Sequence, residues 1–173
     1  FGSRLNYRQE KHSWQIGIET SSQQDQRDRY LNLKGIQGAQ SFSQLESFRN
    51  LGIYILDEVQ WKKLLLRTSL RYDDLSLGAD SVFEDQKYQV LNPSIGLSYE
   101  IDLKQRLFVN FSSSFETPTL SELSSNPSGK EGLNLELNPS SALNYEIGWK
   151  GLWAKTRIEA HLVLMDRSNE ILP

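Results

Sequence analysis

Apolar and polar residues alternate along most of the chain, which is the pattern of a β-strand with two chemically different faces. In 63–73, for example, every second residue from Leu64 to Tyr72 is apolar or Thr, whereas Arg67, Arg71 and Asp73 lie on the opposite face. The runs are about 9–12 residues long, which exceeds the usual soluble strand and suits a tilted strand that crosses a bilayer. The pattern predicts eight antiparallel strands: Phe1–Gln9, Ser13–Thr20, Glu46–Gln60, Lys63–Asp73, Val90–Ile101, Arg106–Glu116, Leu143–Leu152 and Lys155–Asp166.

The links between these strands alternate in length. Short links are predicted near Glu10–His12, Trp61–Lys62, Asp102–Gln105 and Gly151–Ala154, and long polar links at Ser21–Gln44, Asp74–Gln89 and Thr117–Ala142. Outer-membrane barrels have tight periplasmic turns and long extracellular loops, whereas compact soluble domains rarely collect such long links at one end. We therefore expect an all-β, antiparallel transmembrane β-barrel fold. Eight strands can close a small barrel or form an arc of a larger one.

Composition narrows the class further. The hydrophobic fraction is 38% and the mean hydropathy −0.53, and no run approaches the roughly 18–20 apolar residues of a transmembrane helix. A helical membrane protein is excluded, but a transmembrane barrel is not, because its inward face is polar. With a net charge of −3, the chain does not have the basic character that is typical of nucleic-acid-binding domains. Without cysteine, the chain has no disulfide framework.

Several motifs resemble one known family. The chain carries Pro-Thr-Leu-x-Glu-Leu at Pro118–Leu123, an Asn138–Pro139 turn, and Tyr-Glu-x-Gly-x-Lys from Tyr145 to Lys150. This order resembles the late barrel region of TonB-dependent outer-membrane receptors. Three further stretches resemble the same family, and the similarity extends from about Phe48 to Pro173. Leu56, Gln60 and Ser69 depart from the residues that are common in the family. The supporting stretches are Leu51–Trp61, Leu64–Asp73 and Asn92–Tyr99.

The resemblance implies that residues 1–173 are a partial barrel domain, about eight strands of a larger barrel. The family's plug domain, its TonB-binding motif and its C-terminal strand are not in this chain, and both ends are expected to be cut from something longer. The implied location is the outer membrane of a Gram-negative bacterium. The implied partners are outer-membrane lipid, the plug domain, the TonB protein and a small-molecule ligand of unknown identity. The implied function is energy-coupled import of a siderophore, haem, cobalamin or glycan.

The motif residues are expected to be structural. Pro118 ends a strand by removing a ladder donor, Leu120 and Leu123 fix the loop to the barrel rim, and Asn138–Pro139 initiates a turn. No ligand-binding residue can be named. The complete set of motif residues is Pro118, Thr119, Leu120, Glu122, Leu123, Asn138, Pro139, Tyr145, Glu146 and Gly148.

No enzymatic chemistry is predicted. His12 and His161 are isolated, Ser112–Ser114 lies in a predicted strand without a nearby histidine, and no spacing indicates a metal or cofactor site. The acidic residues of the predicted loops, such as Asp80, are interpreted as solvated charges. Three alternatives remain: a passive porin-like channel, an outer-membrane enzyme whose catalytic residues lie elsewhere, and a soluble all-β binding module.

Overall fold

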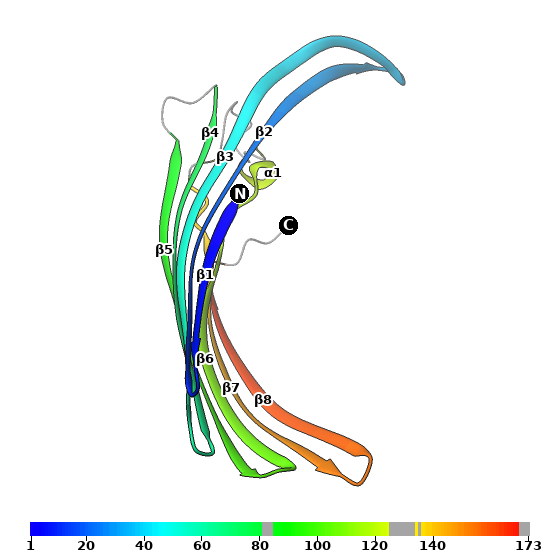
Figure 1. Ribbon diagram of the computed structural model, residues 1–173. Helices are drawn as coiled ribbons and strands as arrows, with labels where there is room; N and C mark the ends of the chain where they lie inside the picture. Colours follow the sequence, from blue (N-terminus) through cyan, green and yellow to red (C-terminus); the bar gives the residue numbers. More distant parts are fainter. Residues whose placement is uncertain (81–84, 125–133, 135, 170–173) are drawn as a thin grey trace.

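The computed structural model describes residues 1–80, 85–124, 134 and 136–169. The described residues form one eight-stranded antiparallel sheet in which every strand pairs with its neighbours in sequence. The sheet is strongly curved, and the short helix α1 lies on its concave side (Figure 1). The predicted all-β antiparallel fold is confirmed. The elements are β1 (Gly2–Gln9), β2 (His12–Leu33), β3 (Ile36–Trp61), β4 (Leu64–Ala79), β5 (Gln86–Asp102), β6 (Gln105–Glu116), α1 (Leu120–Ser124), β7 (Ser140–Trp153) and β8 (Thr156–Ser168).

Four two-residue turns join the strands at one end of the sheet, which we call the turn end. They are Glu10–Lys11, Lys62–Lys63, Leu103–Lys104 and Ala154–Lys155. Lys62 and Ala154 have φ values of 54° and 51° in the left-handed region, which allows the chain to reverse within two residues. The turns at 10–11 and 103–104 fall within the predicted short links, whereas Lys63 and Lys155 lie one residue beyond them, at the predicted starts of strands.

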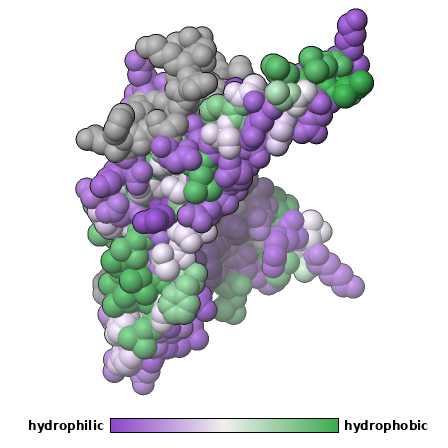
Figure 2. All heavy atoms as spheres, turned by 90° about the horizontal axis from the view of Figure 1, so that it is seen from above, coloured by the Kyte–Doolittle hydropathy of each residue, from purple (hydrophilic) through white to green (hydrophobic). Residues whose placement is uncertain are grey.

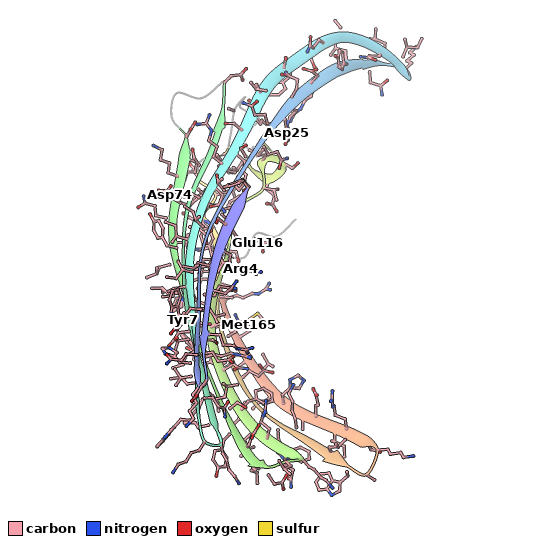
Figure 3. All side chains as sticks on the ribbon, viewed as in Figure 1. Arg4, Tyr7, Asp25, Asp74, Glu116 and Met165 are labelled. Carbon is pink, nitrogen blue, oxygen red and sulfur yellow. The ribbon has the colours of Figure 1, made fainter. Side chains whose placement is uncertain are left out.

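The strand register lines up one alternating apolar set from neighbouring strands on the convex face. Ile16 pairs with Ile55, which pairs with Leu70, and the row continues into the remaining strands. On β4 the apolar face runs from Leu64 to Tyr72, about 26 Å along the strand at about 3.3 Å per residue. This length suits an apolar band that faces lipid. Figure 3 shows Tyr7 on the convex side and Arg4, Glu116 and Met165 on the concave side.

The prediction of a long link at Ser21–Gln44 is wrong. β2 and β3 continue through this stretch as paired strands and reverse at Lys34–Gly35, with a shift of register near Tyr30. The projecting hairpin is polar on both faces over Ser21–Asp28, so no alternation of apolar residues marks it as a strand. Backbone pairing, rather than burial, extends the ladder. Figure 2 shows that hydrophobic residues gather at its far end, where Leu31, Leu33 and Ile36 are exposed.

The other two long links are shorter than predicted. β4 continues to Ala79 and β5 begins at Gln86, so Asp74–Gln89 is mostly strand, and residues 81–84 lie outside the described part. Within Thr117–Ala142, residues 120–124 form α1 and β7 begins at Ser140. The end of the sheet opposite the turns is therefore partly ordered secondary structure rather than loop.

A small hydrophobic core lies on the concave face just beyond the apolar band. Leu75, Leu77 and Tyr88 from β4 and β5 pack with Leu123 of α1. Leu123 is 0% exposed and Leu77 is 1% exposed. The core fixes α1 against the wall of the sheet, at the end that we call the mouth.

Candidate ligand-facing site on the concave face

The Pro-Thr-Leu-x-Glu-Leu motif folds as a capping box at the start of α1. The Thr119 amide and hydroxyl both donate to Glu122 Oε2, at 2.7 and 2.9 Å, and the Glu122 amide donates to Thr119 Oγ1 at 3.3 Å. These contacts satisfy backbone donors that the first helical turn leaves without partners. The spacing of Thr119 and Glu122 therefore has a physical reason, since only residues three apart can cap each other in this way.

The apolar residues of the same motif attach α1 to the wall. Pro118 is buried, and Leu123 is buried among the side chains of β4 and β5. The Tyr88 hydroxyl donates to the Leu137 carbonyl at 3.2 Å, which ties the returning chain to the same core. Burial raises the pKa of Tyr88, so its hydroxyl remains a donor at neutral pH.

A pocket of about 320 Å³ lies between α1 and the base of the projecting hairpin. Its floor is apolar, formed by Phe48 and Leu77, and its rim carries hydroxyls and charges. An apolar floor with a few convergent polar groups is typical of small-molecule sites. Figure 3 shows Asp25 on the concave side of β2. The described residues of the rim are Gln23, Asp25, Arg27, Thr117, Pro118, Thr119, Leu120 and Ser121.

A buried ion pair supports this pocket from β2 and β3. Arg27 donates to Glu46 twice, from Nε to Oε1 at 2.6 Å and from Nη2 to Oε2 at 3.0 Å. The Glu46 side chain is 0% exposed and also accepts from Gln44 Nε2 at 3.0 Å. The hydrogen bond to Glu46 raises the pKa of Arg27 above its usual value, so the guanidinium is always charged. The pocket therefore has an edge held by an ion pair, in which Glu46 balances the charge of Arg27.

The cluster of Arg27, Gln44 and Glu46 is not apparent from the sequence. Arg27 and Gln44 lie in the stretch Ser21–Gln44, whose pattern predicts a loop without pairing. Two strands must be paired before Arg27 lies directly opposite Gln44. A stretch with polar residues on both faces carries no periodic signal for that pairing.

Further from the mouth, the concave face is covered by paired charges. Arg71 contacts Asp73 and Glu19, at 2.8 and 2.9 Å. Arg67 pairs with Glu58, and Lys150 lies 3.4 Å from Glu159. Such pairs leave the wall polar and hydrated with little net charge.

The motif residues of β7 occupy both faces. Tyr145 lies on the convex face and contacts Phe111, with ring centroids 5.2 Å apart. Glu146 lies on the concave face and accepts from Asn110 Nδ2 at 2.8 Å, with His161 Nδ1 2.9 Å from its other oxygen. Gly148 lies beneath Phe108, whose ring occupies the space that a Cβ at this position would need.

The structure therefore brings together only part of the predicted motif set. Pro118, Thr119, Leu120, Glu122 and Leu123 meet at the mouth. Tyr145, Glu146 and Gly148 belong to the wall further along β7 and lie in a separate place. Asn138 is exposed and Pro139 half-buried in the connection that leads into β7. That all ten residues are structural rather than ligand-binding stays a prediction.

Among the described residues, no group of three or more His, Cys, Asp or Glu side chains could hold a metal ion. No helix in the described ranges is both long and apolar enough to cross a membrane.

Comparison with known proteins identifies the family to which this sheet belongs. The family model described as "TonB dependent receptor-like, beta-barrel" matches residues 1–173. Two strains of Haemophilus influenzae have a protein named TonB-dependent heme receptor A that is 27% identical to this chain. The matches extend over 84 residues (40% of this chain, 11% of the relative) and 106 residues (49% and 14%). The chain thus aligns with only a small part of these relatives.

Solved structures agree on the fold. The FrpB iron transporter from Neisseria meningitidis (F3-3 variant) superposes with a TM-score of 0.73 at 17% identity, covering 94% of this chain and 26% of that chain. The copper transporter OprC gives a TM-score of 0.75 at 15% identity, covering 94% and 28%. The eight-stranded sheet therefore matches about a quarter of each complete receptor chain. From the match over its whole length, the chain belongs to the TonB-dependent receptor-like β-barrel family of the Gram-negative outer membrane.

Proposed function

We propose that the whole protein is an energy-coupled outer-membrane importer of a scarce ligand, and that residues 1–173 form part of its barrel domain. The concave wall would then face a plug domain, and the TonB protein would supply energy through parts outside this chain. The observation that carries the proposal is the family match over 1–173 together with a mouth built around a defined pocket.

The pocket between α1 and the hairpin contributes to ligand contact in this proposal. Its rim offers both a carboxylate, Asp25, and a guanidinium, Arg27, above an apolar floor. At about 320 Å³ it lies at the small end of ligand sites, so it would hold one part of a larger ligand. The polar groups fit ligands with both hydrogen-bonding and apolar parts.

The ligand class is an iron siderophore, haem, cobalamin or a glycan. The two curated relatives are named as heme receptors, which makes haem the first ligand to test. This chain contains two histidines, His12 and His161, and neither lines the mouth pocket. An axial histidine at that pocket would therefore have to come from another part of the whole protein.

The test uses the full receptor in its own cells, with uptake of a panel of labelled ligands from these four classes. We expect one ligand to be taken up and uptake to fall to background when the TonB protein is deleted. Uptake that continues unchanged after the deletion would instead support a passive channel. Failure to take up any panel member, in cells that display the receptor, would contradict the proposed ligand classes.

The pocket is tested separately with Gln23→Ala and Asp25→Ala in the full receptor. Each removes a rim group, so affinity for the imported ligand should fall by on the order of tenfold for Asp25→Ala, as for loss of a charged hydrogen bond, and by less for the neutral Gln23→Ala. Asp28→Ala is the matched control, because Asp28 belongs to the same strand but its carboxylate contacts Gln26 and Gln40 and does not line the pocket. Equal affinity in all variants would remove the pocket from the proposal and leave the importer intact.

A further inference from the structure

The four turns at the turn end share a chemical regularity. Each places lysine at its second residue: Lys11, Lys63, Lys104 and Lys155. With Lys62, five of the nine lysines in the chain lie among these eight residues. A turn of two residues needs a special backbone geometry but has no need of lysine. Because the turn geometry does not explain the repeated lysines, we look for their cause in the groups that surround the turns.

Large apolar side chains lie directly beside these lysines. Trp61 and Trp153 end the strands before two of the turns, and both are more than half exposed. Leu103 is fully exposed within the third turn, next to Lys104. Tyr7 stacks on Trp14 above the first, with ring centroids 5.3 Å apart. Such aromatic residues mark the level at which a membrane surface meets water.

Lys62 lies beside one of the exposed indole rings. Its φ of 54° is the left-handed conformation, which glycine adopts without strain. Lys34 and Ala154, the first residues of two other turns, have φ values of 55° and 51°, so the turn geometry alone does not select lysine. The Lys62 ammonium lies 5.8 Å from the centroid of the Trp61 ring, at the edge of the apolar band.

Few acidic groups oppose these lysines. Among the turn residues only Glu10 is acidic, and Asp102 precedes the third turn. The Asp102 carboxylate already accepts from the Lys104 amide at 2.7 Å and from Gln105 Nε2 at 3.0 Å. At the mouth, by contrast, the convex face carries Asp74 (Figure 3). Positive charge is therefore concentrated at the turn end of the sheet, where the Lys63 ammonium also donates to the Ile101 carbonyl at 2.8 Å.

We propose that the lysine row of the turn end binds the phosphates of anionic phospholipids in the periplasmic leaflet of the outer membrane. Short turns lie on the periplasmic side in outer-membrane barrels. Neighbouring turns are separated by two strand spacings, about 10 Å, so each lysine can meet a different lipid headgroup. The indole rings lie at headgroup level and the ammonium groups reach the phosphates beyond them.

The test uses the purified full receptor in detergent, titrated with phosphatidylglycerol or phosphatidylcholine of the same acyl chains. Retained lipids are counted by native mass spectrometry at low and high salt. The wild type should retain phosphatidylglycerol in preference, and salt should reduce the preference. The combined variant Lys11→Gln, Lys63→Gln, Lys104→Gln and Lys155→Gln should lose it. Each single change should weaken binding by on the order of fivefold.

Controls separate charge from folding. Lys34→Gln and Lys87→Gln remove lysines that lie away from the turn end and should leave the preference unchanged. Arginine at the four turn positions should restore it. Lys62→Gly removes a charge while relieving backbone strain, so a weaker preference without loss of thermal stability would support the proposal. Equal retention of both lipids by the wild type, or an unchanged preference in the combined variant, would overturn it.

Discussion

The two ends of the sheet are built by different forces. At the turn end, two-residue turns close each hairpin and large apolar side chains remain exposed to the surroundings of the barrel. At the mouth, Leu75, Leu77 and Leu123 are buried in a small core, and Glu46 is buried against Arg27. Water drives apolar burial, whereas lipid does not. The mouth therefore behaves like a piece of a soluble protein attached to a membrane wall.

Because of this difference, we expect mutations at the mouth and at the turn end to have different effects on the structure. At the mouth, removal of a side chain should open local structure, because packing holds α1 and the hairpin in place. At the turn end, removal of a side chain should leave the backbone in place, because ladder hydrogen bonds hold the strands. The following changes test that contrast in the full receptor, with local opening followed by hydrogen–deuterium exchange.

The largest effect is expected for Arg27→Ala. It leaves the fully buried Glu46 carboxylate without its bidentate partner, at a cost of about 3 kcal/mol to local stability. Glu46→Gln should cost less, because it removes the buried charge and the remaining Arg27 is 29% exposed and can reach water. Exchange at 44–48 measures both. A larger effect for Glu46→Gln would show that the buried charge is not the dominant cost.

Leu123→Ala should follow at about 2–4 kcal/mol, since a fully buried leucine leaves a cavity between α1 and the wall. Detachment of α1 would appear as faster exchange at 119–124, with the β4–β5 ladder near the turn end unchanged. Leu33→Ala is the control, because Leu33 is 58% exposed at the end of the hairpin and should have almost no effect.

Thr119→Ala should cost about 1 kcal/mol, because it removes the hydroxyl of the capping box. Thr119→Ser keeps the hydroxyl and should restore most of the loss. The readout is again exchange at the first turn of α1. Identical behaviour of the alanine and serine variants would mean that the cap does not hold the helix.

The smallest effect is expected at the turn end, with pH. The hydrogen bond from the Lys104 amide lowers the pKa of the exposed Asp102 carboxyl below its usual value. A depressed pKa stabilises the turn at neutral pH, and the contribution is lost as the pH falls through the lowered value. Exchange at Lys104 should therefore quicken only below about pH 4, apart from the intrinsic effect of pH. In Asp102→Asn this additional acid dependence should disappear.

Sequence reasoning predicted the wall of the barrel well and the mouth poorly. The alternation from Leu64 to Tyr72 and its counterparts determines which face meets lipid, because a shift by one residue would reverse every side chain. The turns at Lys62–Lys63 and Ala154–Lys155 follow from where alternation stops. These features are local, so a single sequence contains them.

The mouth depends on contacts between residues that are distant in sequence. Arg27 meets Glu46 only after β2 and β3 pair, and Leu123 meets Leu77 only after α1 folds back. The motif at Pro118–Leu123 is visible in the sequence, but its capping box is not predicted, because a short helix inside a loop gives no periodic pattern. For charged residues such as Lys150 and Glu159, the alternation of the sequence predicts the face of the sheet, but it does not predict which charge pairs with which.

The brevity of α1 determines the order in which the mouth assembles. A helix of five residues is not stable on its own, because ordering the backbone of the first turn costs more conformational entropy than its few hydrogen bonds offset. Its capping box and Leu123 become favourable only once β4 and β5 present the core that receives them. We therefore expect α1 to be among the last of the described elements to form, after the strands that receive it have paired.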